Sequence, residues 1–219
     1  MRFPGAKEKF VTVPCGLTPL PAHSAETPAW AKTLKRPFFI YVGTFSENKN
    51  QRRLVEAWTL LQEMHSDFPA LVLAGPYPAD YRANVMEAVL KKLLRPAEVL
   101  LPGRISNEDL AWAYQNALGM LQPSIAEGFG LPVIEAMSLG VPVACSNTTS
   151  LPETAGGAAR LFDPFDPVKI GEAAKELWRD AGLRGKLSAQ GKVRSQAFTW
   201  QQSAAKIANE IERQLAVQG

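Results

Sequence analysis

Two carboxylates eight positions apart are the residues of this chain whose spacing most plainly allows chemistry. Glu127 and Glu135 bracket the run EGFGLPVIE, in which two glycines flank a phenylalanine and a proline follows. Glycine lets backbone N–H groups turn toward a ligand and proline fits the first turn of a helix, so a helix is expected to begin near Leu131. The free N–H groups and the positive dipole end of such a helix favour an anion, most often a phosphate.

Both acids are expected to line one pocket. Helical side chains lean back toward the N-terminus, so Glu135 points toward the loop that Glu127 begins. A carboxylate does not bind a phosphate directly, so this pair indicates acceptors for ribose and sugar hydroxyls beside a diphosphate. The alternative is a favourable charge at a helix start, which is common. The apolar surroundings of Glu135 in LPVIEAMSLG argue against it, because an unpaired buried charge is costly.

An alternation of strands and helices must position these residues. Short apolar runs closed by Gly, Pro or Ser predict strands at 38–43, 70–75, 98–103, 117–123 and 141–146. Amphipathic patterns predict helices at 49–64 and 79–94, and Ser106 is expected to cap another helix, with Asp109 three residues on. This alternation is typical of an α/β fold with a doubly wound, Rossmann-like parallel sheet.

In such a sheet, ligands bind outside the carboxyl ends of the strands. The loops expected at that edge are 43–49, 75–78, 103–105, 123–130 and 146–150. The two glutamates therefore lie there, and so does Lys49 in the run GTFSENKN. The dipole disfavours a lysine at a helix start, so Lys49 needs another reason for its position. The alternative is a solvated lysine.

Composition indicates an ordinary globular chain. It has 219 residues, of which 46% are hydrophobic and 21% charged, with a net charge of +3. Its apolar stretches are shorter than the ~20 residues of a membrane-spanning helix, and MRFPGAKEKF has no signal-peptide core. Cys15 and Cys145 are the only cysteines, which favours the cytoplasm. The clusters at 52–53 and 91–92 are interpreted as solvated helix faces, so no nucleic-acid partner is expected.

The stretch from LPGRISNEDL through EGFGLPVIEAMSLG to LFDPFDP closely resembles the donor-binding half of retaining family 4 glycosyltransferases of the GT-B fold, whose signature is Glu, seven residues, Glu. The resemblance runs from roughly Phe38 to the C-terminus. It implies that Glu135 binds the ribose hydroxyls of a nucleotide. It also implies that Glu127, the expected catalytic residue, contacts the transferred sugar near its reacting carbon.

The resemblance extends the expected site to other loops. It implies that Lys49 neutralises the donor diphosphate and that the loop 103–105 holds the base. Many members carry an arginine where this chain has Thr44, so neutralisation of the diphosphate is expected to rest on Lys49, the helix start and Arg104. The alternative for Arg104 is a surface residue, because the resemblance gives the base contact to the backbone of its loop. The full set of expected donor-binding residues is Gly43, Thr44, Lys49, Gly103, Arg104, Ile105, Ser124, Gly128, Phe129, Gly130, Leu131 and Glu135.

No metal ligand is expected. The Asp-x-Asp motif of the other large transferase fold is absent, and Asp163 and Asp166 in FDPFDP are interpreted as a turn. A helix dipole and a lysine can stabilise a leaving diphosphate without metal. We therefore expect no cofactor apart from a GDP- or UDP-linked sugar as co-substrate. The resemblance implies that the anomeric configuration of the sugar is retained, with Glu127 orienting sugar hydroxyls rather than acting as a covalent nucleophile.

Three segments are predicted. Residues 1–36 are expected to form a remnant strand and a proline-rich linker, 37–197 the donor-binding domain, and 198–219 a crossover helix capped by Thr199. The resemblance implies an N-terminal acceptor domain, in cis or in trans, that this sequence lacks. Neither His23 nor His65, which is expected to be a favourable cation at a helix end, replaces the histidine of that domain.

Three function classes follow. The leading one is a hexosyltransferase domain for surface polysaccharide or glycoconjugate synthesis, reminiscent of enzymes that use GDP-mannose, in the cytoplasm and with membrane association of the full enzyme left open. The alternative is a stand-alone nucleotide or nucleotide-sugar binding module. A nicotinamide-dependent oxidoreductase is a third, but the glycine pattern differs and the strand after it ends at Asn147 rather than at an acid.

Overall fold

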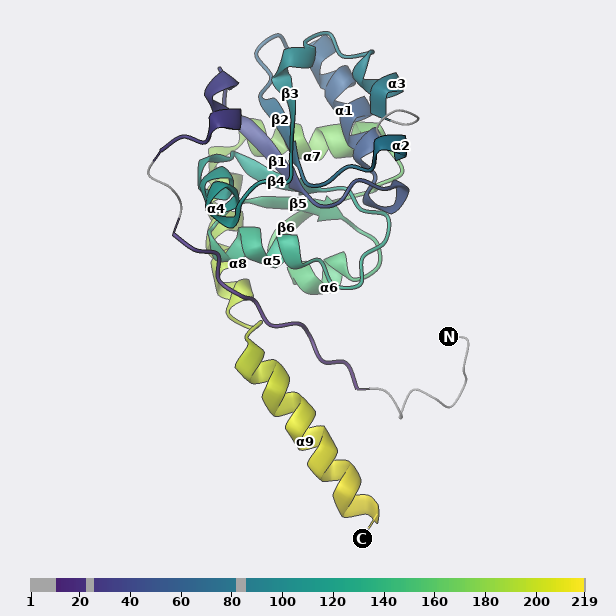
Figure 1. Cartoon of the computed structure of the whole chain (residues 1–219), viewed down its shortest axis with the longest axis vertical. Helices are drawn as coiled ribbons and strands as arrows, with labels where there is room; N and C mark the ends of the chain where they lie inside the picture. Colours follow the sequence, from purple (N-terminus) through teal and green to yellow (C-terminus); the bar gives the residue numbers. More distant parts are fainter. Residues whose placement is uncertain (1–10, 23–25, 82–85, 219) are drawn as a thin grey trace.

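Six short strands form one parallel sheet in the computed structural model, which describes residues 11–22, 26–81 and 86–218 (Figure 1). Residues 1–10 of the expected remnant strand and His23 lie outside this part of the chain. The strands are β1 (Phe38–Val42), β2 (Ala70–Ala74), β3 (Val99–Gly103), β4 (Gly119–Gln122), β5 (Val143–Ser146) and β6 (Ala159–Phe162).

Strand β1 shows why this sheet needs helices on both faces. Its side chains alternate, with Phe39 and Tyr41 in one hydrophobic cluster and Phe38 and Ile40 in the other. All four are buried, which is the pattern of a parallel strand covered on both sides. Figure 1 shows α1 and α7 on one face of the sheet and α4 and α5 on the other.

Two helices begin at residues whose side chains cap them, as the sequence predicts. Ser106 Oγ accepts from the Asp109 N–H, and Thr199 Oγ1 accepts from the Gln202 N–H, so both expected caps are confirmed. The α-helices are α1 (Gln51–Met64), α2 (Ala79–Tyr81), α3 (Glu87–Leu90), α4 (Asn107–Asn116), α5 (Leu131–Ser138), α6 (Leu151–Ala155), α7 (Pro167–Arg179), α8 (Ala181–Ser195) and α9 (Trp200–Gln218). Within the described residues, the 3₁₀ turns are η2 (Ala29–Thr33), η3 (Glu47–Lys49) and η5 (Pro96–Glu98).

The strand order is β3-β2-β1-β4-β5-β6, so the direction of winding reverses between β1 and β4. These two strands pair in parallel, with Phe39 opposite Gly119 and Ile40 opposite Met120. Connections leave such neighbours toward opposite sides and open a crevice at their carboxyl ends. The loops after β1 and β4 therefore meet at the ligand-binding edge of this fold.

Glycines let the carboxyl ends of three strands pack closely. The Gly75 N–H donates to the Gly103 carbonyl at 2.8 Å. A Cβ atom on Gly75, whose φ is +141°, would lie 2.1 Å from the carbonyl oxygen of Gly43. No other residue fits there without moving backbone, so this edge is tightly built.

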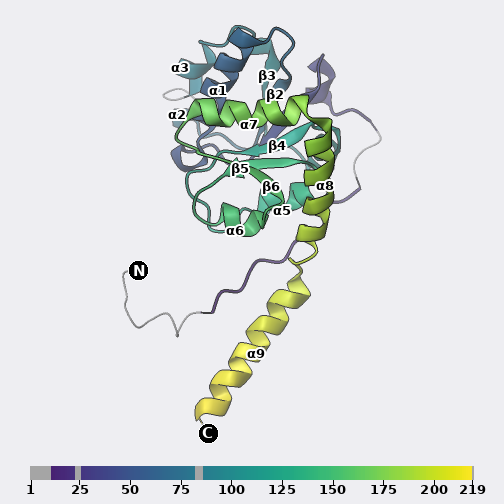
Figure 2. The same ribbon diagram turned by 180° about the vertical axis from the view of Figure 1, so that it is seen from behind.

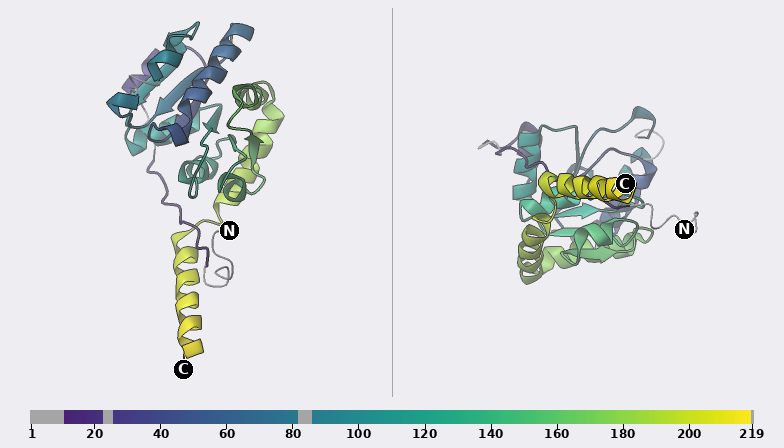
Figure 3. Two further views of the ribbon diagram at one scale, coloured as in Figure 1. Left: turned by 90° about the vertical axis from the view of Figure 1, so that its right-hand side faces the viewer. Right: turned by 90° about the horizontal axis from the view of Figure 1, so that it is seen from below.

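Helix α9 projects away from the sheet (Figures 1 to 3). Residues 14–17, which precede the sheet in sequence, lie beside the start of α9. The Leu17 N–H donates to the Phe198 carbonyl at 2.8 Å, and Ser203 Oγ donates to the Pro14 carbonyl at 2.7 Å. Among the described residues, no helix combines the length and the apolar character that crossing a bilayer requires. The expected segment boundaries, at 36 and 197, stay a prediction.

The five expected strands are confirmed to within about two residues. Strand β6 was not expected. The helix predicted at 49–64 is confirmed to within two residues, and the helix predicted at 79–94 was wrong in where it ends. Helix α1 begins at Gln51, because Lys49 ends the preceding 3₁₀ turn. Over 79–94, the described residues form α2 and α3, residues 82–85 lie outside the described part of the chain, and α3 ends at Leu90, before the predicted end. Pro96 restricts the residue before it, and Leu94 is exposed, so nothing favours extending α3.

Candidate functional site at the carboxyl edge of the sheet

The loop after β4 turns into α5 through a left-handed glycine. Gly130 has φ +98° and directly precedes the helix, which begins at Leu131 as expected, with Pro132 in its first turn. A Cβ atom on Gly130 would lie 2.6 Å from Leu151 Cδ2, whereas a Cβ atom on Gly128 would meet nothing within 4 Å. Gly130 is thus required by the backbone, and Gly128 leaves open space at the surface.

Lys49 and Glu127 form an ion pair across the two loops. Lys49 Nζ lies 2.6 Å from both carboxylate oxygens of Glu127. The same carboxylate accepts from Ser124 Oγ at 2.8 Å and from Gln122 Nε2 at 3.1 Å, through Oε1. The Glu127 side chain is only 10% exposed and that of Lys49 is 29% exposed. A largely buried charge thus has a cation and two neutral donors as partners.

The sequence placed Lys49 and Glu127 at one edge but did not predict that they pair. It also missed Gln122, which is buried at the end of β4. A glutamine in a strand that is otherwise apolar was a usable signal, because a buried amide needs polar partners. Its Nε2 donates to Ser124 Oγ at 2.8 Å as well as to Glu127.

Glu135 has a different neighbour. Its carboxylate lies near the hydroxyl of Tyr114, a fully buried residue of α4, and the Pro132 carbonyl lies 3.3 Å from the same hydroxyl, so the two oxygens share its one proton. Burial raises the pKa of the Glu135 carboxyl above its ordinary value, and a hydrogen bond from Tyr114 opposes part of that rise. The structure gives Glu127 and Glu135 separate partners. That both acids line one pocket stays a prediction.

Threonine and serine hydroxyls after β5 hold the Gly-Phe-Gly loop. Thr149 Oγ1 accepts from the Glu127 N–H at 3.0 Å, and Ser150 Oγ donates to the Glu127 carbonyl at 2.9 Å. Thr154 Oγ1 donates to the Phe129 carbonyl at 2.6 Å. Sequence reasoning missed these three residues. Their signal was the hydroxyl-rich run NTTSLPET at the expected edge.

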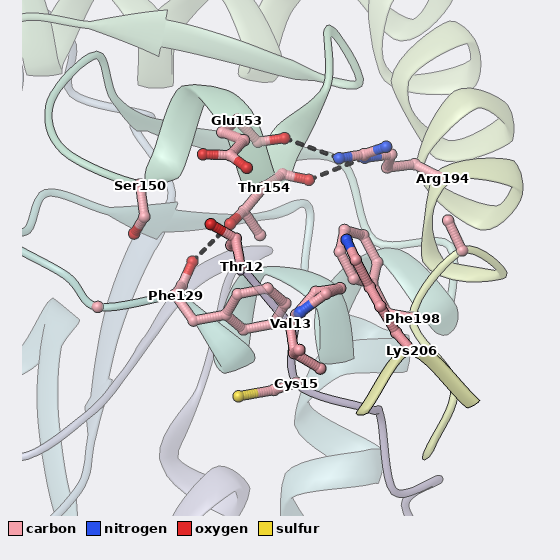
Figure 4. Close-up of a pocket in the computed structure, with 13 residues that line it drawn as sticks. Thr12, Val13, Cys15, Phe129, Ser150, Glu153, Thr154, Arg194, Phe198 and Lys206 are labelled. Atoms are coloured by element: carbon pink, nitrogen blue, oxygen red, sulfur yellow. Dashed lines mark hydrogen bonds between the residues drawn. The ribbon is translucent and has the colours of Figure 1, made fainter. Parts of the chain in front are cut away.

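A cavity of about 390 Å³ adjoins the other side of this loop (Figure 4). The ring of Phe129 packs edge-on against Phe198 at 5.3 Å between centroids. Neither Glu127 nor Glu135 lines the cavity. The lining residues are Thr12, Val13, Pro14, Cys15, Gly128, Phe129, Ser150, Glu153, Thr154, Arg194, Ala197, Phe198 and Lys206.

The remaining expected contacts lie along the same edge. Thr44 is exposed at the end of β1, and its carbonyl accepts from Gln51 Nε2 at 3.0 Å. Gly103 ends β3, two strands away from β1, and is followed by Arg104, which is exposed and has no ion-pair partner within the described part of the chain. Ile105 is half-buried against the core. A role for Arg104 in neutralising a diphosphate stays a prediction.

The acids of FDPFDP make local turns, as expected. Asp163 Oδ1 accepts from the Phe165 N–H, and Asp166 Oδ1 accepts from the Val168 N–H to cap α7, both at 2.8 Å. Across residues 11–22, 26–81 and 86–218, no group of three or more His, Cys, Asp or Glu side chains is placed to hold a metal ion. His65 directly follows α1 as its C-cap residue, and its ring packs against Phe68 and Trp178.

Known proteins resemble this chain in sequence and in fold. The family described as glycosyl transferases group 1 matches residues 24–194. O-antigen chain mannosyltransferase B of Escherichia coli is 35% identical over 176 residues, which are 78% of this chain and 45% of that protein. The sucrose-phosphate synthase of Thermosynechococcus elongatus superposes with a TM-score of 0.76 at 28% identity, over 94% of this chain and 53% of that one.

A second structure matches over nearly its whole length. The C-terminal domain of a group 1 family glycosyl transferase (LpcC) from Francisella tularensis superposes with a TM-score of 0.67 at 19% identity, over 81% of this chain and 95% of that one. The chain thus spans about half the length of the longer relatives that it matches. With most of its length inside the family match, the chain belongs to the group 1 glycosyl transferases and has the fold of the C-terminal domain of a GT-B enzyme.

Proposed function

We propose that this chain binds a nucleoside-diphosphate sugar at the carboxyl ends of β1 and β4. Together with an N-terminal acceptor domain, in cis or in trans, it would transfer the hexose with retention and without metal, in surface polysaccharide or glycoconjugate synthesis. The observation that carries the proposal is the pairing of Lys49 with Glu127 where the winding of the sheet reverses. It puts a cation suited to a diphosphate beside a carboxylate suited to sugar hydroxyls.

The proposed chemistry follows from an exchange of partners. A diphosphate carries more negative charge than one carboxylate, so it competes for the ammonium group of Lys49. Glu127 remains held by Ser124 and Gln122 and can then accept hydrogen bonds from the sugar. The start of α5 adds N–H groups and a positive dipole end beside the developing charge of the leaving group.

The proposed donor is GDP-mannose, with UDP-linked sugars as the alternative. The support is the 35% identity to a mannosyltransferase named for O-antigen chains. Glu135 is proposed to accept from the ribose hydroxyls, which both nucleotides share, so it does not discriminate between them. Gly103, Arg104 and Ile105 are proposed to lie at the base, which is the part of the donor that differs.

Calorimetric titration of the chain with GDP, UDP, GDP-mannose and UDP-glucose tests the proposal. We expect GDP and GDP-mannose to bind, with affinities unchanged by EDTA. Lys49→Met should lower the affinity for GDP at least about tenfold, because it removes a charge-assisted contact worth roughly 1.5 to 3 kcal/mol. Lys186→Met, at an exposed position of α8, is the matched control and should bind as the unaltered chain does. No binding of any nucleotide, or equal effects of both substitutions, would contradict the proposal.

A further inference from the structure

The residue after Lys49 is a buried asparagine in an unusual backbone conformation. Asn50 is 2% exposed and has φ +62°, in the left-handed region. Residues other than glycine rarely adopt this region, and asparagine is among the few that tolerate it. The left-handed backbone at position 50 therefore favours asparagine or glycine.

The side chain of Asn50 joins three loops. Its Nδ2 donates to the carbonyl of Pro123 at 2.9 Å and to that of Pro164 at 2.7 Å. Its Oδ1 accepts from Arg53 Nη1 at 3.1 Å. Both amide protons face carbonyl oxygens, which sets the orientation of the amide. An aspartate here would place a carboxylate oxygen against two carbonyl oxygens.

Two of these loops carry the proposed donor site. Pro123 immediately precedes Ser124, which donates to the Glu127 carboxylate. The Ile125 N–H also donates to the Asn48 carbonyl at 2.8 Å. The residues before and after Lys49 are thus both hydrogen-bonded to the loop that leads to Glu127. Of these two contacts, the one from Asn50 comes from a side chain and can be removed by substitution, whereas the one from Asn48 comes from the backbone.

We infer that Asn50 is a positioning residue, which sets the turn after β1 so that the Lys49 ammonium faces Glu127 and, with donor bound, the diphosphate. This inference rests on the proposed function. The structural alternative is that Asn50 only stabilises the fold, as a buried amide with satisfied hydrogen bonds does anywhere. The two differ in whether its effect on binding passes through Lys49.

Asn50→Gly separates the two roles, because glycine keeps the left-handed backbone and removes the side-chain bonds. Gln62→Ala is the matched control. Gln62 is a buried amide near the C-terminal end of α1, whereas Asn50 lies at the N-terminal end of that helix. The Gln62 side chain exchanges hydrogen bonds with the backbone of Arg95 at 3.1 and 3.2 Å. Both substitutions should lower the free energy of unfolding in urea.

The test is calorimetric titration with GDP and UDP, well below the melting temperature of each variant. We expect Asn50→Gly to lower the affinity for nucleotide about tenfold, which corresponds to about 1.4 kcal/mol, and Gln62→Ala to leave that affinity unchanged. In a double-mutant cycle, Lys49→Met with Asn50→Gly should bind no more weakly than Lys49→Met alone. If Asn50→Gly does not fold, Asn50→Ser, which keeps one donor, should show a smaller loss.

Unchanged nucleotide affinity in Asn50→Gly, or in Asn50→Ser where that variant is used, would overturn the inference. Additive losses in the double variant would overturn it as well, because Asn50 would then act without Lys49. Failure of the unaltered chain to bind any nucleoside diphosphate would instead reject the proposed function. The two failures are therefore distinguishable in one series of titrations.

Discussion

At the scale of single residues, a lysine and a glutamate 78 positions apart hold each other at the carboxyl edge of the sheet. The pair changes what each side chain is expected to do alone. The ammonium group of Lys49 is neutralised by the Glu127 carboxylate, and Ser124 and Gln122 orient that carboxylate. Under the proposed function, the diphosphate of a donor would displace the carboxylate from the ammonium group.

This exchange leads to a prediction for Glu127→Ala. The substitution removes the competitor for Lys49, so the affinity for free GDP or UDP should stay the same or rise. The affinity for the intact sugar donor should fall about tenfold, because the acceptor for its hydroxyls is lost. Calorimetry with nucleotide and nucleotide sugar measures both. An equal loss on both ligands would contradict the assigned role of Glu127.

Glu135→Gln should affect nucleotide affinity and the pH dependence of protein stability, and the two effects are measured separately. For binding, the amide loses charge-assisted bonds to ribose hydroxyls, so the affinity for nucleoside diphosphate should fall by about 1 to 3 kcal/mol. The control is Glu63→Gln, at an exposed position of α1, which should have no effect on calorimetric affinity. Equal affinities of Glu135→Gln and the unaltered chain would rule out the ribose contact.

For stability, the sign follows from the raised pKa of the Glu135 carboxyl, whose main cause is burial. The folded state binds the proton more tightly than the unfolded state, so this contribution to stability is present below the unfolded pKa and is lost as pH rises through the folded pKa. Glutamine does not titrate. Urea unfolding at about pH 4 and about pH 7 should therefore show Glu135→Gln gaining stability, relative to the unaltered chain, at the higher pH. A constant difference would contradict this assignment.

At the scale of elements, the start of α5 depends on one glycine and not on its neighbour. Gly130→Ala must place a Cβ atom at φ +98° and close to Leu151, so it should cost at least about 1 kcal/mol of unfolding free energy. Gly128→Ala meets open space and should change that energy by less than about 0.5 kcal/mol. Denaturant titration of the two variants compares them directly, and similar losses would show that the turn does not need the left-handed conformation.

The elements also differ in how well their patterns reveal them. Strands β1, β2, β4 and β5 are almost wholly buried and read as apolar runs. Strand β6 pairs with β5 at the edge of the sheet and is only partly buried. Arg160, which pairs with Glu176 of α7 at 2.6 Å, interrupts the apolar residues of this four-residue strand. An edge strand made by pairing with a neighbour leaves little periodic signal in the sequence.

At the scale of the whole molecule, α9 stands apart from the sheet and exposes an apolar face. Trp200, Ile207, Ile211 and Leu215 are between 49% and 65% exposed. None of them belongs to either hydrophobic cluster of the sheet domain. The stability of that domain should therefore not depend on this face.

Substitutions in α9 test this separation. Ile207→Lys with Ile211→Lys should change the unfolding free energy of the sheet domain by less than about 0.5 kcal/mol, as exposed positions do. Phe198→Ala is the contrast, because Phe198 is buried against Phe129 and Arg194, and it should cost roughly 3 kcal/mol. Thermal unfolding followed by near-ultraviolet circular dichroism measures both. A comparable loss in the lysine variant would show that the face of α9 is packed.

The amino-acid sequence by itself determined the alternation of strands and helices, the start of α5 at Leu131 and the caps at Ser106 and Thr199. Each of these depends on residues within a few positions of one another, so composition and spacing predict it. It also placed Lys49 at the same edge as the two glutamates, because parallel strands bring their carboxyl ends together.

Only the tertiary structure decided which of these residues meet. Lys49 reaches Glu127 over 78 positions, and Asn50 reaches Pro123 and Pro164 over 73 and 114. Such contacts depend on the neighbours that the sheet order makes and on the burial that demands a partner for each polar group. Neither is visible in local spacing. The fold thus gives Glu127 a lysine partner, and it gives the loop before Glu127 an asparagine contact, neither of which local spacing reveals.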